Sequence, residues 1–196
     1  MIARHRKRHS RRLAESSEVA LAADELGTDI AFQNALSFWS RVAVPELSIV
    51  LSHLRALSLI HQVHHWQAKG DPFFGDHKLF EQLYTGTLDQ IDSIAERAVG
   101  LGGPENVDMS SQLMHALKLV EACGSLDTIP MSSELAKRSL TAELGFIRCL
   151  DLVVQSMRDN GTLTRGTDNL LAGIEDAHES NVYLLKRRIA SDLRTS

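Results

Sequence analysis

Residues 64–97, HHWQAKGDPFFGDHKLFEQLYTGTLDQIDSIAER, hold three histidines and six acidic residues in 34 positions. Apolar side chains recur with helical spacing through the later part of this stretch and just beyond it. They are Phe80, Leu83, Tyr84, Ile91, Ile94 and Ala98. The stretch therefore predicts a helix with one apolar and one polar face, from about Asp76 to the Gly102-Gly103-Pro104 stop. Its polar face is either solvated surface or part of a metal site.

Three other segments carry the same periodicity, at about 45–66, 132–160 and 167–193, and no segment shows the alternation of a strand. The sequence predicts an all-α protein with a ferritin-like four-helix bundle as its architecture. The long connection between the second and third helices should contain a short helix at about 112–122, because so long a loop seldom lacks structure. Residues 13–40 are expected to add short helices against the bundle.

Size and composition indicate one domain at 13–196, preceded by a basic arm at 1–12. No apolar run approaches the roughly 18 residues of a membrane span. The basic start has no apolar run behind it, so it does not predict a secretory signal. Cys123 and Cys149 are not spaced as a redox or zinc motif, which favours reduced thiols and a cytoplasmic localisation.

The polar face of the second predicted helix contains two pairs of candidate metal ligands. With His77 at zero, Glu81 falls near 40°, Asp92 near 60° and Glu96 near 100° on a helical wheel. Imidazole with carboxylate suits iron, manganese or zinc. Glu81 and Asp92, however, lie about 16 Å apart along the axis, so one straight helix cannot bring both pairs to one ion. A second chain packed about a two-fold axis can, which predicts two equivalent shared sites in a dimer.

Ordinary surface charge is the competing interpretation of these residues. Histidine and glutamate four residues apart are common on exposed helices, and Asp92, Glu96 and Arg97 also suit plain surface electrostatics. Only the joint pattern favours a site.

Residues 65–103 resemble the Dps family of ferritin-like mini-ferritins, whose pattern is approximately HWxxxGxxFxxxHxxxE/D, then DxxAER and a Gly-Gly stop. A looser similarity continues to the final helix, IEDAHESNVYLLKRRI. The matching residues are His65, Trp66, Gly70, Phe73, Phe74, His77, Glu81, 92–97, Gly102 and Gly103.

The resemblance implies an iron site formed by His65, His77 and Glu81 of one chain with Asp92 and Glu96 of its two-fold partner. It further implies a hollow dodecamer that oxidises Fe(II) at paired irons, often with hydrogen peroxide, and stores ferric mineral. Trp66 resembles the family tryptophan thought to intercept stray oxidising equivalents, although simple packing at a helix end would also explain it.

The histidines outside this ligand set have other predicted roles. His61 and His64 are close enough to His65 in sequence to be candidates for supporting its ligands, whereas His53 and His115 suit the core edge or surface. A different ferritin design places both irons inside one bundle using two ExxH motifs. Glu175 and His178 supply only one such motif, so we expect both at the surface.

The arm ARHRKRHSRR carries six positive charges and no acid, which leaves −10 for residues 13–196 out of a net −4. It is either a solvated tail or, as in some Dps-like proteins, a sequence-independent DNA contact driven by counterion release. DNA binding would add association with the nucleoid. The arm's charged residues are Arg4, Arg6, Lys7, Arg8, Arg11 and Arg12.

Two functional hypotheses follow. The first is a ferroxidase and iron store that protects against oxidative stress; the alternative is a structural or DNA-packaging particle with little oxidase activity. Under the first, the acidic body should draw iron in through openings near the start of the last helix. Asp168 is the leading candidate there, with helix capping as its simpler role.

Overall fold

The computed structural model describes residues 27, 29–122 and 132–192, and the chain is almost entirely helical there, with no strand in those ranges. Residues 29–38 form a helix ahead of the bundle. The basic arm lies outside the described residues. The following elements, in chain order, are α2 (Pro45–Gln67), α3 (Phe73–Gly86), α4 (Leu88–Gly102), the 3-10 turn η1 (Pro104–Val107), α5 (Met109–Ala122), α6 (Ser132–Asp159) and α7 (Arg165–Asp192).

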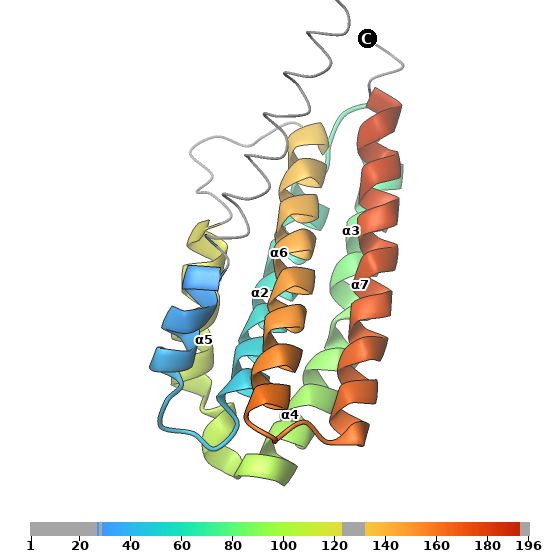
Figure 1. The fold of residues 1–196 in the computed structure, drawn as a ribbon. Helices are drawn as coiled ribbons and strands as arrows, with labels where there is room; N and C mark the ends of the chain where they lie inside the picture. Colours follow the sequence, from blue (N-terminus) through green and yellow to red (C-terminus); the bar gives the residue numbers. More distant parts are fainter. Residues whose placement is uncertain (1–26, 28, 123–131, 193–196) are drawn as a thin grey trace, which may run out of the picture.

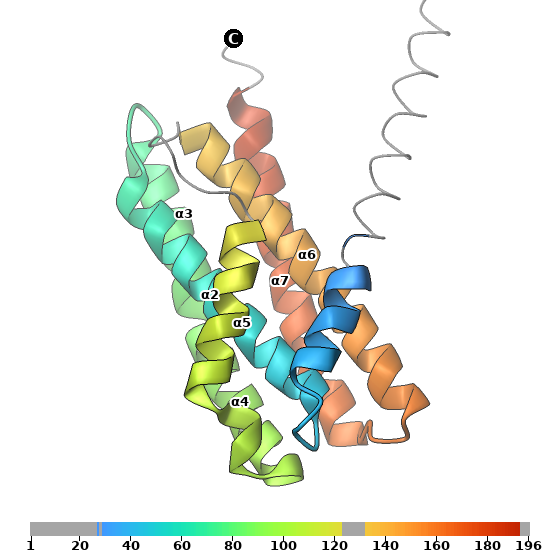
Figure 2. The ribbon, with the colours of Figure 1, turned by 90° about the vertical axis from the view of Figure 1, so that its left-hand side faces the viewer.

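The long helices form a four-helix bundle. In it, α3 and α4 lie end to end and together take the place of one of the four helices (Figure 1). α5 and residues 29–38 lie outside the bundle on the side of α2 and α6 (Figure 2). The predicted all-α bundle and the short helix in the long connection are therefore confirmed. No helix among the described residues is long and apolar enough to span a membrane.

The apolar stripes predicted from the sequence meet in the core. Each fully buried large side chain contributes about 1.5–3 kcal/mol relative to an exposed one. The main cluster joins α2, α4, α6 and α7, and a smaller one joins the start of α6 to α3. The largest fully buried side chains are Leu47, Ile49, Leu51, Leu54, Phe80, Leu83, Ile94, Leu135, Phe146, Leu150, Met157 and Leu171.

The prediction of one continuous second helix is wrong, because Thr87 interrupts it. The Thr87 N–H and Oγ1 both donate to the carbonyl oxygen of Tyr84, at 3.4 and 2.7 Å, which tightens the chain into a turn. The segment Thr85-Gly86-Thr87 is poor in helix propensity, and its hydroxyls compete for backbone carbonyls. The wheel angles calculated from His77 therefore do not carry over to Asp92 and Glu96.

Two glycines, Gly102 and Gly103, determine the end of α4 for different structural reasons. Gly103 has φ +87°, a conformation that side chains with a Cβ rarely adopt. A Cβ on Gly102 would overlap the side chains of Asn106 and Val44. Asn106 is buried and accepts a hydrogen bond from the Val44 N–H at 3.0 Å. The Gly-Gly stop thus lets the end of α4 pack closely against the start of α2.

Candidate metal centre

Two stacked imidazoles, His65 from α2 and His77 from α3, form the most clearly organised part of the candidate site. Their ring centroids lie 3.7 Å apart at an interplanar angle of 25°. His65 Nδ1 donates to the backbone carbonyl of His77 at 2.8 Å, and His77 Nδ1 donates to that of His65 at 3.1 Å. Because carbonyl oxygens only accept, each Nδ1 carries a proton, and in the neutral form of each ring the lone pair is on Nε2. This is a tautomer ready to bind a metal.

The turn between α2 and α3 brings these histidines together. Gly70 has φ +80°, and its carbonyl accepts from the Phe73 N–H at 3.0 Å, so the chain reverses within a few residues. Ser132 Oγ, at the start of α6, accepts from the Lys69 N–H at 3.0 Å and donates to the Lys69 carbonyl at 2.8 Å. The turn is therefore anchored to a third helix.

A buried ion pair fixes the start of α3 next to His77. The carboxylate of Asp76 is fully buried and accepts from Arg188 of α7 through both oxygens, with Nη2–Oδ2 at 3.0 Å. A bidentate arginine–carboxylate contact restrains orientation as well as distance. Arg188 thus holds the helical turn that carries His77.

Glu81, one turn beyond His77 on α3, adds a carboxylate to this group. Its Oε2 accepts from Lys78 Nζ at 2.6 Å, and its side chain is 38% exposed. The hydrogen bond and charge of Lys78 lower the pKa of Glu81, with smaller contributions from His65 and His77. Glu81 is therefore ionised near the two imidazoles.

The remaining two predicted ligands lie elsewhere on the chain. Asp92 and Glu96 are exposed on α4, beyond the break at Thr87. Within the described ranges of this one chain, no group of three or more His, Cys, Asp or Glu side chains is placed to hold a metal ion. The structure thus brings His65 and His77 into contact, with Glu81 one turn further along α3, and places Asp92 and Glu96 on α4.

Trp66 and Asp168 are both exposed. The Trp66 side chain is 66% exposed on the last turn of α2, so it does not pack into the core. Asp168 lies in the first turn of α7, where Thr164 Oγ1 accepts from the Thr167 N–H at 3.1 Å. Thr164 therefore caps the helix, and the carboxylate of Asp168 is left exposed.

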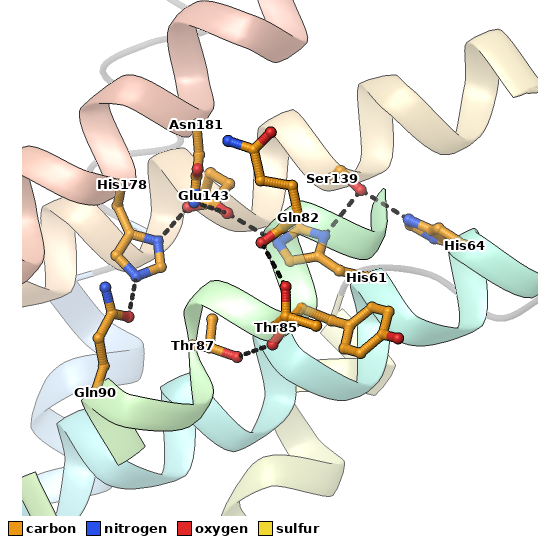
Figure 3. Close-up of polar contacts among 11 residues, drawn as sticks. His61, His64, Gln82, Thr85, Thr87, Gln90, Ser139, Glu143, His178 and Asn181 are labelled. Carbon is orange, nitrogen blue, oxygen red and sulfur yellow. Dashed lines mark hydrogen bonds and ion pairs between the residues drawn. The ribbon is translucent and has the colours of Figure 1, made fainter. Parts of the chain in front are cut away.

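His61 and His64 point into the interior of the bundle (Figure 3). Ser139 Oγ lies 3.1 Å from His61 Nδ1 and 2.8 Å from His64 Nδ1. His61 Nε2 donates to Glu143 Oε1 at 2.9 Å. The hydrogen bonds of both histidines thus connect α2 to α6 rather than to the candidate ligands His65 and His77.

Glu143 is the centre of this buried network and was not identified from the sequence. Its Oε2 accepts from His178 Nδ1 at 2.5 Å, and Asn181 Nδ2 donates to Oε1 at 3.2 Å. Burial alone would raise the pKa of Glu143, but the hydrogen bonds from His178 and His61 outweigh it and lower the pKa to about 2. A fully buried carboxylate is therefore kept ionised by imidazoles from two other helices.

The expectation that His178 lies at the surface is wrong. Its side chain is fully buried, and its Nε2 lies 2.9 Å from Gln90 Oε1 of α4. His178 falls between Ile174 and Val182 on the buried stripe of α7, which explains its position. Glu175, by contrast, is half-buried near the surface, and burial with the charges of Asp151 and Glu179 raises its pKa.

Solved structures identify the class of this bundle. DpsC from Streptomyces coelicolor has a TM-score of 0.62 at 21% identity, covering 74% of this chain and 81% of that chain. An archaeal Dps homologue from Halobacterium salinarum has a TM-score of 0.63 at 16% identity, covering 74% and 78%. The fold is that of the ferritin-like helical bundles.

Curated sequences narrow the class to a family. A nutrient stress-induced DNA-binding protein from Synechococcus is 30% identical over 152 residues, which cover 74% of this chain and 80% of the relative. A DNA protection during starvation protein from Helicobacter pylori is 37% identical over 95 residues, covering 46% and 63%. No protein-family model matches the chain. The chain belongs to the Dps family.

Proposed function

We propose that the chain is a Dps-type ferroxidase and iron store that oxidises Fe(II) with hydrogen peroxide or oxygen and protects against oxidative stress. The observation that supports this most strongly is the stacked pair of His65 and His77. Reciprocal hydrogen bonds place a proton on each Nδ1, so in each neutral ring the Nε2 lone pair is the one available to a metal. An ionised Glu81 nearby supplies the anionic ligand that iron favours.

In this proposal the site is completed by a second subunit. Asp92 and Glu96 lie on α4, beyond the break at Thr87 that separates it from the helix carrying Glu81. A two-fold axis would place the carboxylates of one chain against the histidines of its partner, giving two equivalent dinuclear iron sites in each dimer. Assembly of such dimers into a hollow dodecamer would enclose the ferric mineral.

Iron is the substrate in this reaction. Two ferrous ions at one site supply the two electrons that reduce one peroxide, so no hydroxyl radical is released. His65, His77 and Glu81 would hold the ions, and the exposed Trp66 would accept a stray oxidising equivalent.

Anaerobic loading with Fe(II), followed by peroxide, tests the proposal. The assembled wild type should oxidise about two Fe(II) per peroxide, as paired irons require. The variant His77→Ala should slow oxidation about 10–100-fold, whereas Gln82→Ala, at an exposed position of α3, should not. Equal rates for His77→Ala and wild type at equal particle mass would contradict the proposal and favour a structural particle.

DNA contact is a second candidate function, favoured by the names of the curated relatives. The arm at 1–12, with Arg4, Arg6, Lys7, Arg8, Arg11 and Arg12, would supply the attraction, because the rest of the chain is acidic. Deleting residues 1–12 should abolish binding to duplex DNA while iron oxidation is unchanged. Equal DNA affinity and equal salt dependence after the deletion would exclude this role for the arm.

A further inference from the structure

A cavity of about 210 Å³ lies on the side of the bundle away from the candidate iron ligands. Its walls come from the helix at 29–38, from α5, and from α2 and α6 behind them, an arrangement visible in Figures 1 and 2. None of His65, His77, Glu81, Asp92 or Glu96 lines it. The cavity is therefore a separate feature from the proposed ferroxidase site.

The walls of the cavity are largely aromatic and aliphatic. Phe32, Phe38 and Leu119 line it, and the Phe38 ring lies 6.0 Å from the imidazole of His115, which is also part of the wall. An apolar cavity of about 150 Å³ is large enough to bind benzene. This larger cavity can hold a six-membered aromatic ring with a few additional atoms.

Two neutral imidazoles give the cavity one hydrogen-bond acceptor and one donor. Burial lowers the pKa of both His53 and His115 to about 4. His53 Nδ1 donates to the Ile49 carbonyl at 3.2 Å, so its Nε2 is an acceptor. His115 Nδ1 accepts from Trp39 Nε1 at 3.2 Å, so its Nε2 carries a proton and is a donor. Among the described residues neither Nε2 has a hydrogen-bond partner.

A positive charge adjoins the donor side of the cavity. Lys118 follows His115 by three residues on α5, so both side chains lie on the same face of that helix. Its Nζ is held over the Phe38 ring, 5.0 Å from the centroid. Cys149 also lines the cavity, but burial raises the pKa of its thiol to about 12. The lining is thus suited to binding rather than to nucleophilic chemistry.

From this geometry we infer that the cavity binds a small aromatic carboxylate that carries a ring hydroxyl. The ring packs between Phe32, Phe38 and Leu119. The carboxylate binds Lys118 Nζ and the Nε2–H of His115, and the hydroxyl donates to Nε2 of His53. Charge complementarity at Lys118 selects the anion, and the acceptor on His53, whose ring lies 5.8 Å from that of His115, selects the hydroxyl. This ligand site does not depend on iron oxidation.

Titration of the assembled full-length protein with 4-hydroxybenzoate, by calorimetry and saturation-transfer NMR, tests the inference. We expect one molecule per chain with a Kd of about 1 mM or tighter, which is reasonable for about ten non-hydrogen atoms. Ala31→Phe, at an exposed position of the rim, should abolish binding. Lys118→Met should weaken it about tenfold, because a charge-assisted contact is lost. Lys186→Met, on α7, is the matched control and should leave Kd unchanged.

Uncharged 4-hydroxybenzyl alcohol and non-aromatic cyclohexanecarboxylate should each bind at least about tenfold more weakly than 4-hydroxybenzoate. Equal affinity for either analogue, or an unchanged Kd in Ala31→Phe or Lys118→Met, would overturn the inference. So would absence of saturable binding to the wild type. If the wild type shows no saturable binding and Ala31→Phe forms particles of lower mass, the cavity belongs instead to a contact between chains.

Discussion

At the junction of α2 and α3, His65 and His77 donate through Nδ1 to backbone carbonyls, whereas inside the bundle His61 and His178 donate to the carboxylate of Glu143. Both regions combine two imidazoles with one glutamate. In the interior, every oxygen of the carboxylate is already occupied by a hydrogen bond. At the junction, the backbone satisfies one nitrogen of each ring, and Nε2 remains available for a ligand.

The difference shows that the same residue types can form two chemically different clusters. What separates the two regions is the partner of each imidazole and the access of solvent. The side chains of His61, Glu143 and His178 are fully buried, and a buried charge is tolerated only when it is paired. Glu81 is 38% exposed and has a flexible lysine as its partner, which an incoming cation can displace.

The largest expected effect on stability comes from removing the interior carboxylate. Glu143→Ala should destabilise the fold by about 3–5 kcal/mol, because His61 and His178 would be left buried without their carboxylate partner. Glu81→Ala should change stability little, since its ion pair with Lys78 is exposed. Urea unfolding at one fixed protein concentration measures both, because any association between chains would also contribute to stability. Equal destabilisation by the two variants would remove the distinction between the regions.

Acid should affect the interior network through Glu143. Its pKa is lowered from 4.5 to about 2, so its stabilisation is complete above pH 4.5 and is lost as the pH falls toward 2. The shift corresponds to about 3 kcal/mol. The buried histidines His53, His64 and His115, whose pKa values are lowered to about 4, 3 and 4, also favour unfolding in acid. These three histidines are present in both the wild type and Glu143→Gln, so their contribution to acid unfolding is the same in the two proteins.

The wild type should therefore lose more stability than Glu143→Gln between pH 5 and pH 2, as measured by urea unfolding at each pH. Parallel pH profiles for the two proteins would show that Glu143 is not held ionised in the fold.

A smaller effect is expected at Asp168, which belongs to neither histidine region. If acidic openings concentrate Fe(II), Asp168→Asn should slow iron uptake at low salt about two- to fivefold, and added salt should reduce the difference. Because Thr164 rather than Asp168 caps α7, stability should be unchanged. Uptake equal to wild type at low ionic strength would rule out this role for Asp168.

Much of the fold could be predicted from the sequence because helical periodicity reports directly on burial. The segments from Pro45, Ser132 and Arg165 were placed to within about two residues at their starts, since proline, serine and apolar spacing mark helix starts locally. The break at Thr87 was missed because periodicity tolerates a one-residue turn whose φ of −82° and ψ of −16° are nearly helical.

The junction histidines could also be predicted, but the interior network could not. His65 and His77 fall in a contiguous motif, whereas His61, Glu143 and His178 come from three helices distant in sequence. Glu143 and His178 do occupy buried stripes of α6 and α7, where a polar residue is unexpected. That signal was available, yet only the packing of the helices shows that the two side chains meet.

The shared-site model is tested most directly by mixing two damaged subunits. One variant carries His65→Ala and His77→Ala, and the other carries Asp92→Ala and Glu96→Ala. Alone, each should be nearly inactive, because every site in its dimer lacks one half of the ligands. Co-refolded in equal amounts, they should recover about a quarter of the wild-type rate of Fe(II) oxidation, since random pairing makes half of the dimers mixed and each mixed dimer has one intact site. No recovery in mixed particles of wild-type mass would contradict the model.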